Sequence, residues 1–211
     1  MTIRVKFCGF TRSDDVHAAV ACGVHAIGFN LARGPRRIQL DQAVALARLV
    51  PPLVGVVALF ADADVPAMLS AIASMRAVAI QLHGHEPPEV GERLRRHCQV
   101  IKAFAISDAE SLDAVRGYPA DAYLLDTAQA GQSGGSGRAW DHHLLAGRPL
   151  GAPVILAGGL SATTVAAAIR ATRPYGVDVS SGIESSPGIK DARRMQEFMD
   201  AVAASGQPAA L

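Results

Sequence analysis

The stretch Val5-Lys6-Phe7-Cys8-Gly9 decides the fold, because the rest of the chain repeats the pattern that it begins. Apolar residues dominate this run and a glycine ends it, so Arg4–Cys8 is expected to form a short buried strand that leads into a turn. Successive side chains of a strand point to opposite faces, so Lys6 and Cys8 share one face. A lysine and a thiol are therefore expected together at the carboxyl end of this strand.

A strand, a polar junction, a helix and a turn make up the first unit. Thr11-Arg12-Ser13-Asp14-Asp15 supplies capping and acidic first-turn residues for a helix that ends at Gly23. The unit recurs seven more times. Further strands are expected at Ala26–Leu31, Leu53–Phe60, Ala77–Leu82, Val100–Ala105, Ala122–Asp126, Pro153–Ala157 and Gly176–Ser180. Helices are expected at Asp41–Leu49, Val65–Ser74, Pro88–Cys98, Ala109–Arg116, near Asp141–Ala146, and at Ala162–Thr172 and Asp191–Ala204.

The strands are nearly continuous apolar runs, which is typical of a parallel sheet covered on both faces. Eight strands, each followed by a helix and with no break in composition, predict a (β/α)8 (TIM) barrel, an α/β fold in which residues 1–211 form one domain. An open doubly wound sheet fits less well, because it usually has fewer strands and needs no regular count of eight.

Composition narrows the class of protein. The 211 residues are 50% hydrophobic and carry a net charge of +1, with no basic cluster among aromatics, so no nucleic-acid partner is expected. The longest apolar runs have the length of a strand, so no membrane segment is expected. Residues 1–4 lead directly into the first strand, which leaves no room for a signal peptide. Cys8, Cys22 and Cys98 show no CxxC spacing, so we expect no metal site, no disulfide and a cytoplasmic location.

Polar residues gather where the predicted strands end. In this fold the working residues lie at the carboxyl ends of the strands and in the loops that follow. The candidates at these ends are Cys8, Arg33-Gly34-Pro35-Arg36-Arg37, Gln81-Leu82-His83-Gly84, Leu124-Leu125-Asp126, Ala157-Gly158-Gly159 and Asp178-Val179-Ser180-Ser181-Gly182. We expect them all at one rim of the barrel.

The loops after the seventh and eighth strands are expected to bind a phosphate group. Gly158 and Gly159 allow backbone N–H groups to come close to phosphate oxygens, and the hydroxyls of Ser180 and Ser181, next to Gly182, add donors. We call these five residues the phosphate cup. Gly159 and Ser161 also have another interpretation, as a tight turn and a helix N-cap.

Two residues are candidates for acid–base chemistry. Asp126 ends an apolar strand and precedes the glycine-rich segment Thr127–Trp140, which is expected to act as a lid, with disorder as the alternative. Partial burial under a lid raises the pKa of a carboxyl group and suits a general acid, whereas a solvated or arginine-paired carboxylate is the alternative. Cys8 lies beside Lys6, which predicts a lowered pKa and a reactive thiolate, whereas an inert core thiol is the alternative.

Three further residues are less specific. His83 either contacts substrate or is structural. Arg36 can hold a carboxylate at two points, although the sequence does not choose among Arg33, Arg36 and Arg37. Lys102 lies within the fifth strand and would mark a Schiff-base lyase or synthase of the same fold.

Six motifs in one order resemble the phosphoribosylanthranilate isomerase family of the tryptophan pathway. They are Lys6-Phe7-Cys8-Gly9-Phe10-Thr11, Gly34-Pro35-Arg36, Gln81-Leu82-His83-Gly84, Leu125-Asp126, Gly134-Gly135-Ser136-Gly137 and Gly176-Val177-Asp178-Val179-Ser180-Ser181-Gly182-Ile183-Glu184. The resemblance extends from Lys6 to Asp191 and implies a (β/α)8 barrel. It also implies an Amadori rearrangement, in which a 1-(2-carboxyphenylamino) aldose phosphate becomes the corresponding 1-deoxyribulose phosphate.

The resemblance implies a role for each candidate. Asp126 protonates the furanose ring oxygen, and Cys8 removes the C2′ proton, with no metal and no cofactor. Arg36 holds the anthranilate carboxylate and the phosphate cup holds the ribose phosphate. Lys6, His83 and Asp178 are expected to line the substrate pocket.

Other functions remain open from the sequence. They are a related phosphosugar isomerase or lyase of the same fold, an enzyme for a related aminoaldose phosphate, and a non-catalytic phosphosugar-binding barrel. The expected partner is a small phosphoribosyl substrate, bound by a monomer or a homodimer.

Overall fold

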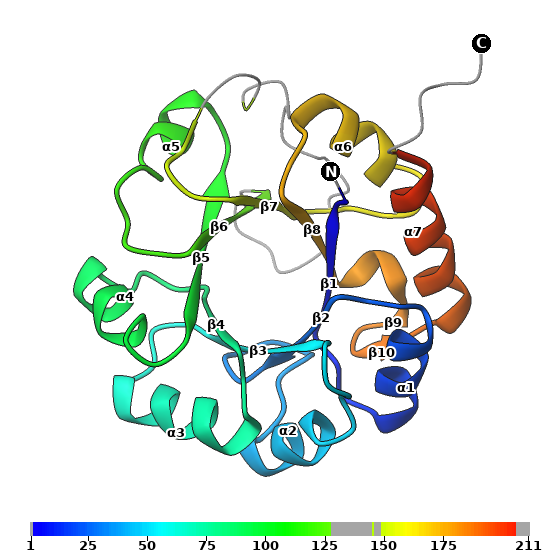
Figure 1. Cartoon of the computed structure of the whole chain (residues 1–211), viewed down its shortest axis with the longest axis horizontal. Coiled ribbons are helices and arrows are strands. Elements are labelled where there is room, and N and C mark those ends of the chain that lie inside the picture. The colour runs from blue at the N-terminus through cyan, green and yellow to red at the C-terminus, as the bar shows by residue number, and fades with distance from the viewer. Residues whose placement is uncertain (1, 128–144, 146–148, 206–211) are drawn as a thin grey trace.

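Eight parallel strands close into a barrel in which neighbours in sequence are neighbours in space (Figure 1). The computed structural model describes residues 2–127, 145 and 149–205. The barrel strands are β1 (Arg4–Cys8), β2 (Ala26–Asn30), β3 (Gly55–Phe60), β4 (Ala79–Leu82), β5 (Gln99–Ile106), β6 (Ala122–Thr127), β7 (Val154–Leu156) and β8 (Gly176–Val179). Because β8 pairs with β1, the sheet has no edge, and the predicted (β/α)8 fold is confirmed.

The helices form a ring outside the barrel (Figure 1). They are α1 (Ser13–Ala21), α2 (Leu40–Ala47), α3 (Val65–Met75), α4 (Pro88–Leu94), α5 (Ala109–Asp113), α6 (Val165–Thr172) and α7 (Ala192–Ser205). The helix expected near Asp141–Ala146 lies outside the described residues apart from Leu145. None of the described helices has both the length and the apolar character that crossing a membrane requires.

Several boundaries differ from the sequence prediction for local reasons. Strand β3 begins at Gly55 rather than Leu53, because Leu53 has a positive φ of 75° and its side chain is fully exposed in a turn. Helix α6 begins at Val165 rather than Ala162. The Ser161 backbone N–H donates to the Thr164 hydroxyl, and such local bonds compete with helix formation. Helices α4 and α5 are shorter than expected, since turns follow Leu94 and Asp113.

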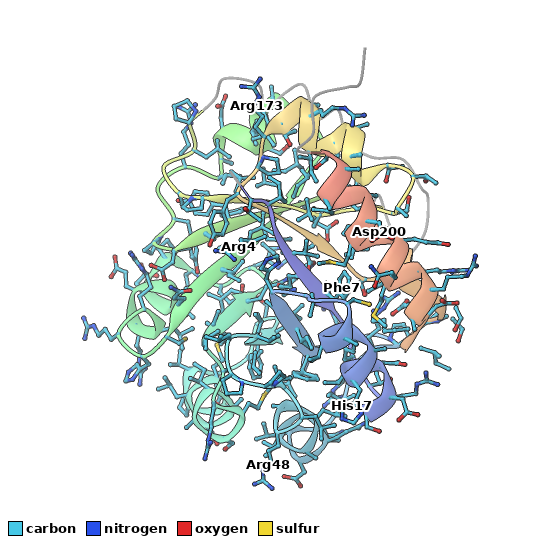
Figure 2. All side chains as sticks on the ribbon, turned by 45° about the vertical axis from the view of Figure 1, so that its right-hand side comes forward. Arg4, Phe7, His17, Arg48, Arg173 and Asp200 are labelled. Atoms are coloured by element: carbon cyan, nitrogen blue, oxygen red, sulfur yellow. The ribbon has the colours of Figure 1, made fainter. Side chains whose placement is uncertain are left out.

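Side chains pack in two layers on either side of the strands. Small and branched residues fill the barrel interior: Val57, Ala79, Ile101, Ala103, Ala122, Leu124, Ile155 and Ala157. The larger apolar residues lie between the strands and the helices. Phe7 on β1, which Figure 2 labels, is one example. Its ring meets the ring of Phe198 on α7 edge-on at a centroid distance of 6.0 Å. The alternation along each strand therefore decides which residues can reach the interior and the rim.

A short hairpin follows β8, and the sequence analysis did not predict it. The chain passes through a 3-10 turn, η2 (Ser181–Ile183), and then through β9 (Glu184–Ser186) and β10 (Ile189–Lys190), which pair antiparallel. Pro187-Gly188 connects the two strands and was the available signal, since this dipeptide marks turns. The hairpin returns the chain to the rim before α7 begins.

Candidate active site

A cavity of about 240 Å³ opens at the carboxyl ends of the strands. We call it the rim pocket. It is lined by Cys8, Gly9, Asn30, Ala32, Arg33, Arg36, Leu59, Ala61, Gln81, His83, Asp126, Asp178 and Ser180. Six of the predicted site residues therefore meet in one place, namely Cys8, Arg36, His83, Asp126, Asp178 and Ser180.

Lys6 lies beneath the rim pocket and does not line it. Its Nζ donates to Asp178 Oδ1 at 2.8 Å, because register pairs Lys6 on β1 with Asp178 on β8. Burial alone would lower the pKa of Lys6, but the Asp178 carboxylate and the Cys8 sulfur outweigh that effect and raise the pKa above its ordinary value. Lys6 is therefore a permanent cation inside the barrel.

The predicted low pKa of Cys8 is wrong for the free protein. The side chain is buried, with 7% exposure, and burial raises the pKa of the Cys8 thiol above its ordinary value. Lys6 and Lys190 act in the opposite direction but do not offset burial, and the Asp178 carboxylate raises the pKa further. The sequence placed Lys6 correctly but did not show that Asp178 pairs with it.

His83 and Asp126 face each other across the pocket. His83 Nε2 lies 4.0 Å from Asp126 Oδ2. Burial lowers the pKa of His83 below its ordinary value, and the nearby Asp126 carboxylate does not reverse the effect, so the ring is neutral near pH 7. The predicted acid therefore has a neutral imidazole beside it rather than a second charge.

Gln81 is a pocket residue that the sequence analysis quoted without giving it a role. Its Nε2 lies 2.9 Å from His83 Nδ1, and donation along this contact places the imidazole proton on Nε2, facing Asp126. Its Oε1 is buried and has no hydrogen-bond partner among the described residues. The signal was the spacing of two, because residues 81 and 83 share a face at the end of β4.

The phosphate cup has a more specific geometry than the sequence indicated. Gly158 and Gly159 both have a positive φ, of 85° and 66°. A Cβ on Gly182 would lie 2.0 Å from the carbonyl oxygen of Leu160, so only glycine allows the turn after β8 to pack against the loop after β7. The Ser180 hydroxyl donates to Cys8 O at 3.0 Å, whereas Ser181 is exposed. Ser180 thus ties the cup to β1.

Arg36 lines the pocket and is held by a residue from the hairpin. Its Nε and Nη2 donate to the two carboxylate oxygens of Glu184 at 2.8 and 2.6 Å. Lys190 Nζ donates to the same carboxylate at 2.7 Å. The sequence predicts no role for Glu184 and Lys190, because the hairpin that carries them is not visible in its pattern.

Lys102 is not in the pocket. Its strand neighbours Ile101 and Ala103 fill the barrel interior, so Lys102 points outward beneath the helices. Its Nζ donates to Glu86 Oε2 at 2.8 Å and to Gly84 O at 2.6 Å, and its side chain is only 5% exposed. This geometry does not support Schiff-base chemistry at Lys102.

The rim pocket combines a thiol, a carboxyl group, a neutral imidazole and a guanidinium group above a buried lysine. Among the described residues, no group of three or more His, Cys, Asp or Glu side chains is placed to hold a metal ion. A closed eight-stranded barrel with a thiol and a carboxyl group lining one pocket at its rim defines the class of the protein: a (β/α)8-barrel enzyme.

Comparison with known proteins identifies the family within this class. Residues 5–201 match the model of the N-(5′-phosphoribosyl)anthranilate isomerase family, and the chain belongs to that family. A relative named N-(5′-phosphoribosyl)anthranilate isomerase, from Myxococcus xanthus, is 43% identical over 207 residues, which cover 95% of this chain and 96% of the relative.

Solved structures of the same family superpose on this chain. The phosphoribosyl anthranilate isomerase of Thermotoga maritima has a TM-score of 0.89 at 33% identity, covering 96% of this chain and all of its own. A second structure, with a TM-score of 0.86 at 31% identity, is a complex with reduced 1-(o-carboxyphenylamino)-1-deoxyribulose 5-phosphate and has the same coverage. A third describes monomers generated from the dimeric Thermotoga maritima enzyme, with a TM-score of 0.85 at 29% identity and again the same coverage.

Proposed function

We propose that this protein is an aldose–ketose isomerase that converts N-(5′-phosphoribosyl)anthranilate to 1-(2-carboxyphenylamino)-1-deoxyribulose 5-phosphate in tryptophan biosynthesis. The observation that carries the proposal is the meeting of Cys8, Asp126 and Arg36 in the rim pocket, which Ser180 of the phosphate cup also lines. Family membership supports it, as does the reduced product analogue bound by a relative.

The first step requires an acid. Asp126 gives its proton to the furanose ring oxygen, the bond between that oxygen and C1′ breaks, and the nitrogen lone pair forms the C=N bond of an iminium ion. The Nε2–H of neutral His83 faces Asp126 and can donate to the carboxylate that this step leaves behind. A neutral ring suits this task, because a full positive charge would hold Asp126 ionised before the reaction.

The second step requires a base. The thiolate of Cys8 removes the proton from C2′, the electron pair forms a C1′=C2′ bond, and the resulting enolamine tautomerises to the ketone. The raised pKa of Cys8 in the free protein means that the thiol is mostly protonated before substrate binds. The positive iminium carbon is adjacent to C2′, so its charge favours the thiolate when it is needed.

Two anchors leave the reacting carbons between Cys8 and Asp126. We propose that Arg36 holds the anthranilate carboxylate and that Gly158, Gly159, Ser181 and Gly182 bind the ribose phosphate. Glycine-rich loops after the seventh and eighth strands of a barrel commonly bind phosphate. Asp178 is proposed to contact a sugar hydroxyl, since it lines the pocket while paired with Lys6.

The chain is proposed to act as one barrel domain in the cytoplasm, as a monomer or a homodimer. The dimeric relative from Thermotoga maritima supports the homodimer. Size-exclusion chromatography with light scattering distinguishes the two.

The test of function is the loss of the fluorescence of phosphoribosylanthranilate on addition of the protein. The proposal expects turnover without added metal or cofactor. A protein that binds the reduced product analogue without turnover would instead be a phosphosugar-binding barrel. Turnover of an aminoaldose phosphate that lacks the ring carboxylate, in preference to phosphoribosylanthranilate, would assign a different substrate.

A further inference from the structure

A buried ionic cluster of three residues lies beside the rim pocket. Arg36 has a role in the proposed function, whereas Glu184 and Lys190 have none. Arg36 donates through Nε and Nη2 to Glu184, at 2.8 and 2.6 Å, and Lys190 Nζ donates to Glu184 Oε1 at 2.7 Å. The side chains of Glu184 and Lys190 are 4% and 0% exposed, whereas that of Arg36 is 25% exposed. We call these residues the Arg36–Glu184–Lys190 cluster.

The geometry of the pair leaves one edge of the guanidinium group for a ligand. Arginine has five N–H donors in a rigid plane, and Glu184 takes the edge formed by Nε and Nη2. The other edge, formed by Nη1 and Nη2, matches a second carboxylate at two points. Glu184 therefore fixes the plane of the guanidinium without using the donors that a substrate carboxylate would need.

The stem of Arg36 is fixed as well. A Cβ on Gly9 would lie 2.5 Å from Arg36 Cδ, so the side chain crosses directly over the turn that follows Cys8. With its stem against Gly9 and one edge on Glu184, Arg36 has few other positions to adopt before substrate arrives. Such preorganisation lowers the entropic cost of binding.

Lys190 keeps the cluster cationic. An Arg36–Glu184 pair alone would be neutral and would attract a substrate carboxylate only weakly. Burial lowers the pKa of Lys190 below its ordinary value, and its hydrogen bond to the Glu184 carboxylate counters this effect and favours the protonated amine. With Lys190 protonated, one carboxylate and two cations leave one net positive charge beside the pocket. Burial disfavours ionisation of Glu184, but Arg36 and Lys190 outweigh it and lower the pKa of Glu184 below its ordinary value, so the carboxylate is ionised at neutral pH.

Lys190 also ties the cluster to the catalytic strand. Its Nζ donates to Cys8 O at 2.6 Å and to Ser180 O at 3.2 Å, and its backbone N–H donates to Asp15 at 3.0 Å. The cluster thus joins the end of β1, the loop after β2 and the hairpin after β8. Glu184 holds Arg36, which is proposed to bind the carboxylate. Lys190 joins Glu184 to the backbone of Cys8, which is proposed to take the proton.

We infer that Glu184 is a positioning residue that makes the site selective for substrates with a carboxylate on the aromatic ring. It acts by orienting Arg36, while Lys190 preserves the positive charge that this recognition needs. The inference rests on the proposed function and adds the residues that set its substrate selectivity.

The test compares two inhibitors on matched variants. One is reduced 1-(o-carboxyphenylamino)-1-deoxyribulose 5-phosphate, and the other is the same molecule without its ring carboxylate. In the Glu184→Gln variant, the affinity for the first is expected to fall about 10- to 100-fold, the range for a hydrogen bond to a charged group. The affinity for the second is expected to stay within about twofold, because it makes no contact through a carboxylate. Glu197→Gln, an exposed change on α7 with the same loss of charge, is expected to alter neither.

A double variant guards against misfolding of the first. Glu184→Gln leaves Lys190 buried without its carboxylate, whereas Glu184→Gln with Lys190→Met removes both charges and restores the net charge of the cluster. The carboxylate preference is expected to stay low in the double variant, since Arg36 is no longer oriented. Recovery of the preference would show that charge rather than position matters and would overturn the assignment of Glu184 as a positioning residue.

The outcomes separate this inference from the proposed function. Equal losses for both inhibitors, or no loss for either, would overturn the inference while wild-type turnover of phosphoribosylanthranilate still stands. Absence of wild-type turnover would instead overturn the proposed function itself.

Discussion

At the scale of single residues, burial raises the pKa of the Cys8 thiol most, and the neighbouring charges adjust it further. Asp178 pairs with Lys6 and raises the pKa of Cys8. Asp178→Asn removes the negative charge of that carboxylate, so the positive charge of Lys6 is no longer offset beside the thiol. The pKa of Cys8 is therefore expected to fall, and more thiolate is expected at a given pH. Thiolate absorbance near 240 nm as a function of pH measures this in a background with Cys22→Ala and Cys98→Ala. An unchanged or higher thiol pKa would show that Asp178 does not control Cys8.

Gln81 offers a second prediction at this scale. Gln81→Leu removes the donor to His83 Nδ1 but also removes a buried carbonyl without a described partner. Loss of the hydrogen bond destabilises the protein by about 1 kcal/mol or somewhat more, and removal of the buried, unpartnered carbonyl stabilises it by a similar amount. Because the two contributions oppose each other, the free energy of unfolding is expected to change by less than about 1 kcal/mol. Because His83 loses its fixed tautomer, kcat/KM is expected to fall about tenfold or more. Urea denaturation and steady-state kinetics measure the two, with the exposed change Gln99→Leu as control. A stability loss without a kinetic effect would make Gln81 a purely structural residue.

Single residues were predictable where strand alternation places them and not where distant contacts do. Cys8, His83, Asp126 and Asp178 follow from the ends of strands. Lys190 donates to Cys8 O across 182 positions in the sequence, and no local pattern reports such a contact. The wrong expectation for the pKa of Cys8 has the same origin, because burial and the Asp178 partner both depend on the closed barrel.

At the scale of elements, Lys102 tests the outward face of β5. It is buried in an ion pair with Glu86, whose carboxylate also accepts from the backbone N–H groups of Asp62 and Gly84. Lys102→Met is expected to lower the free energy of unfolding by about 3–5 kcal/mol, because it leaves a buried carboxylate unpaired. Urea denaturation measures the loss, and Glu86→Gln with Lys102→Met is expected to lose less. A borohydride-trapped adduct on Lys102 of the wild type would contradict its placement outside the pocket.

The turn after β8 gives a second prediction at this scale. Gly182→Ala would push the turn away from Leu160 O and so open the phosphate cup. Inorganic phosphate is expected to compete with substrate in the wild type, and its inhibition constant is expected to rise about tenfold in the variant, the loss of roughly 1.4 kcal/mol. Inhibition kinetics measure this, with Ser185→Ala in the neighbouring hairpin as control. Equal inhibition of both variants and the wild type would place the phosphate elsewhere.

Strands were easier to predict than the segments between them. The extent of an apolar run in the sequence marks the extent of a strand in a parallel barrel. All eight strands accordingly lie within a few residues of their expected positions. The hairpin of Glu184–Ser186 and Ile189–Lys190 has strands of three and two residues, too short for any alternation to be visible. The lid expected at Thr127–Trp140 lies, beyond residue 127, outside the described residues, so its role stays a prediction.

At the scale of the whole molecule, barrel closure brings an acid and a base to one substrate. The strands that carry Cys8 and Asp126, β1 and β6, are separated by β7 and β8 along the closed sheet. Their ends can therefore address a bound sugar from different sides of one pocket, which both residues line.

The pH dependence of turnover in Cys8→Ser and Asp126→Asn tests this division of labour most directly. Both variants are expected to fold, because neither removes core volume, and each is expected to lose about 10²- to 10⁴-fold in kcat, the usual contribution of a positioned acid or base. The wild type is expected to give a bell-shaped profile. Without the acid, the rate should only rise with pH as the Cys8 thiol ionises, and without the thiol it should only fall with pH as Asp126 ionises. Near-full turnover of Cys8→Ser with an unchanged acidic limb would contradict the assignment of Cys8 as the base.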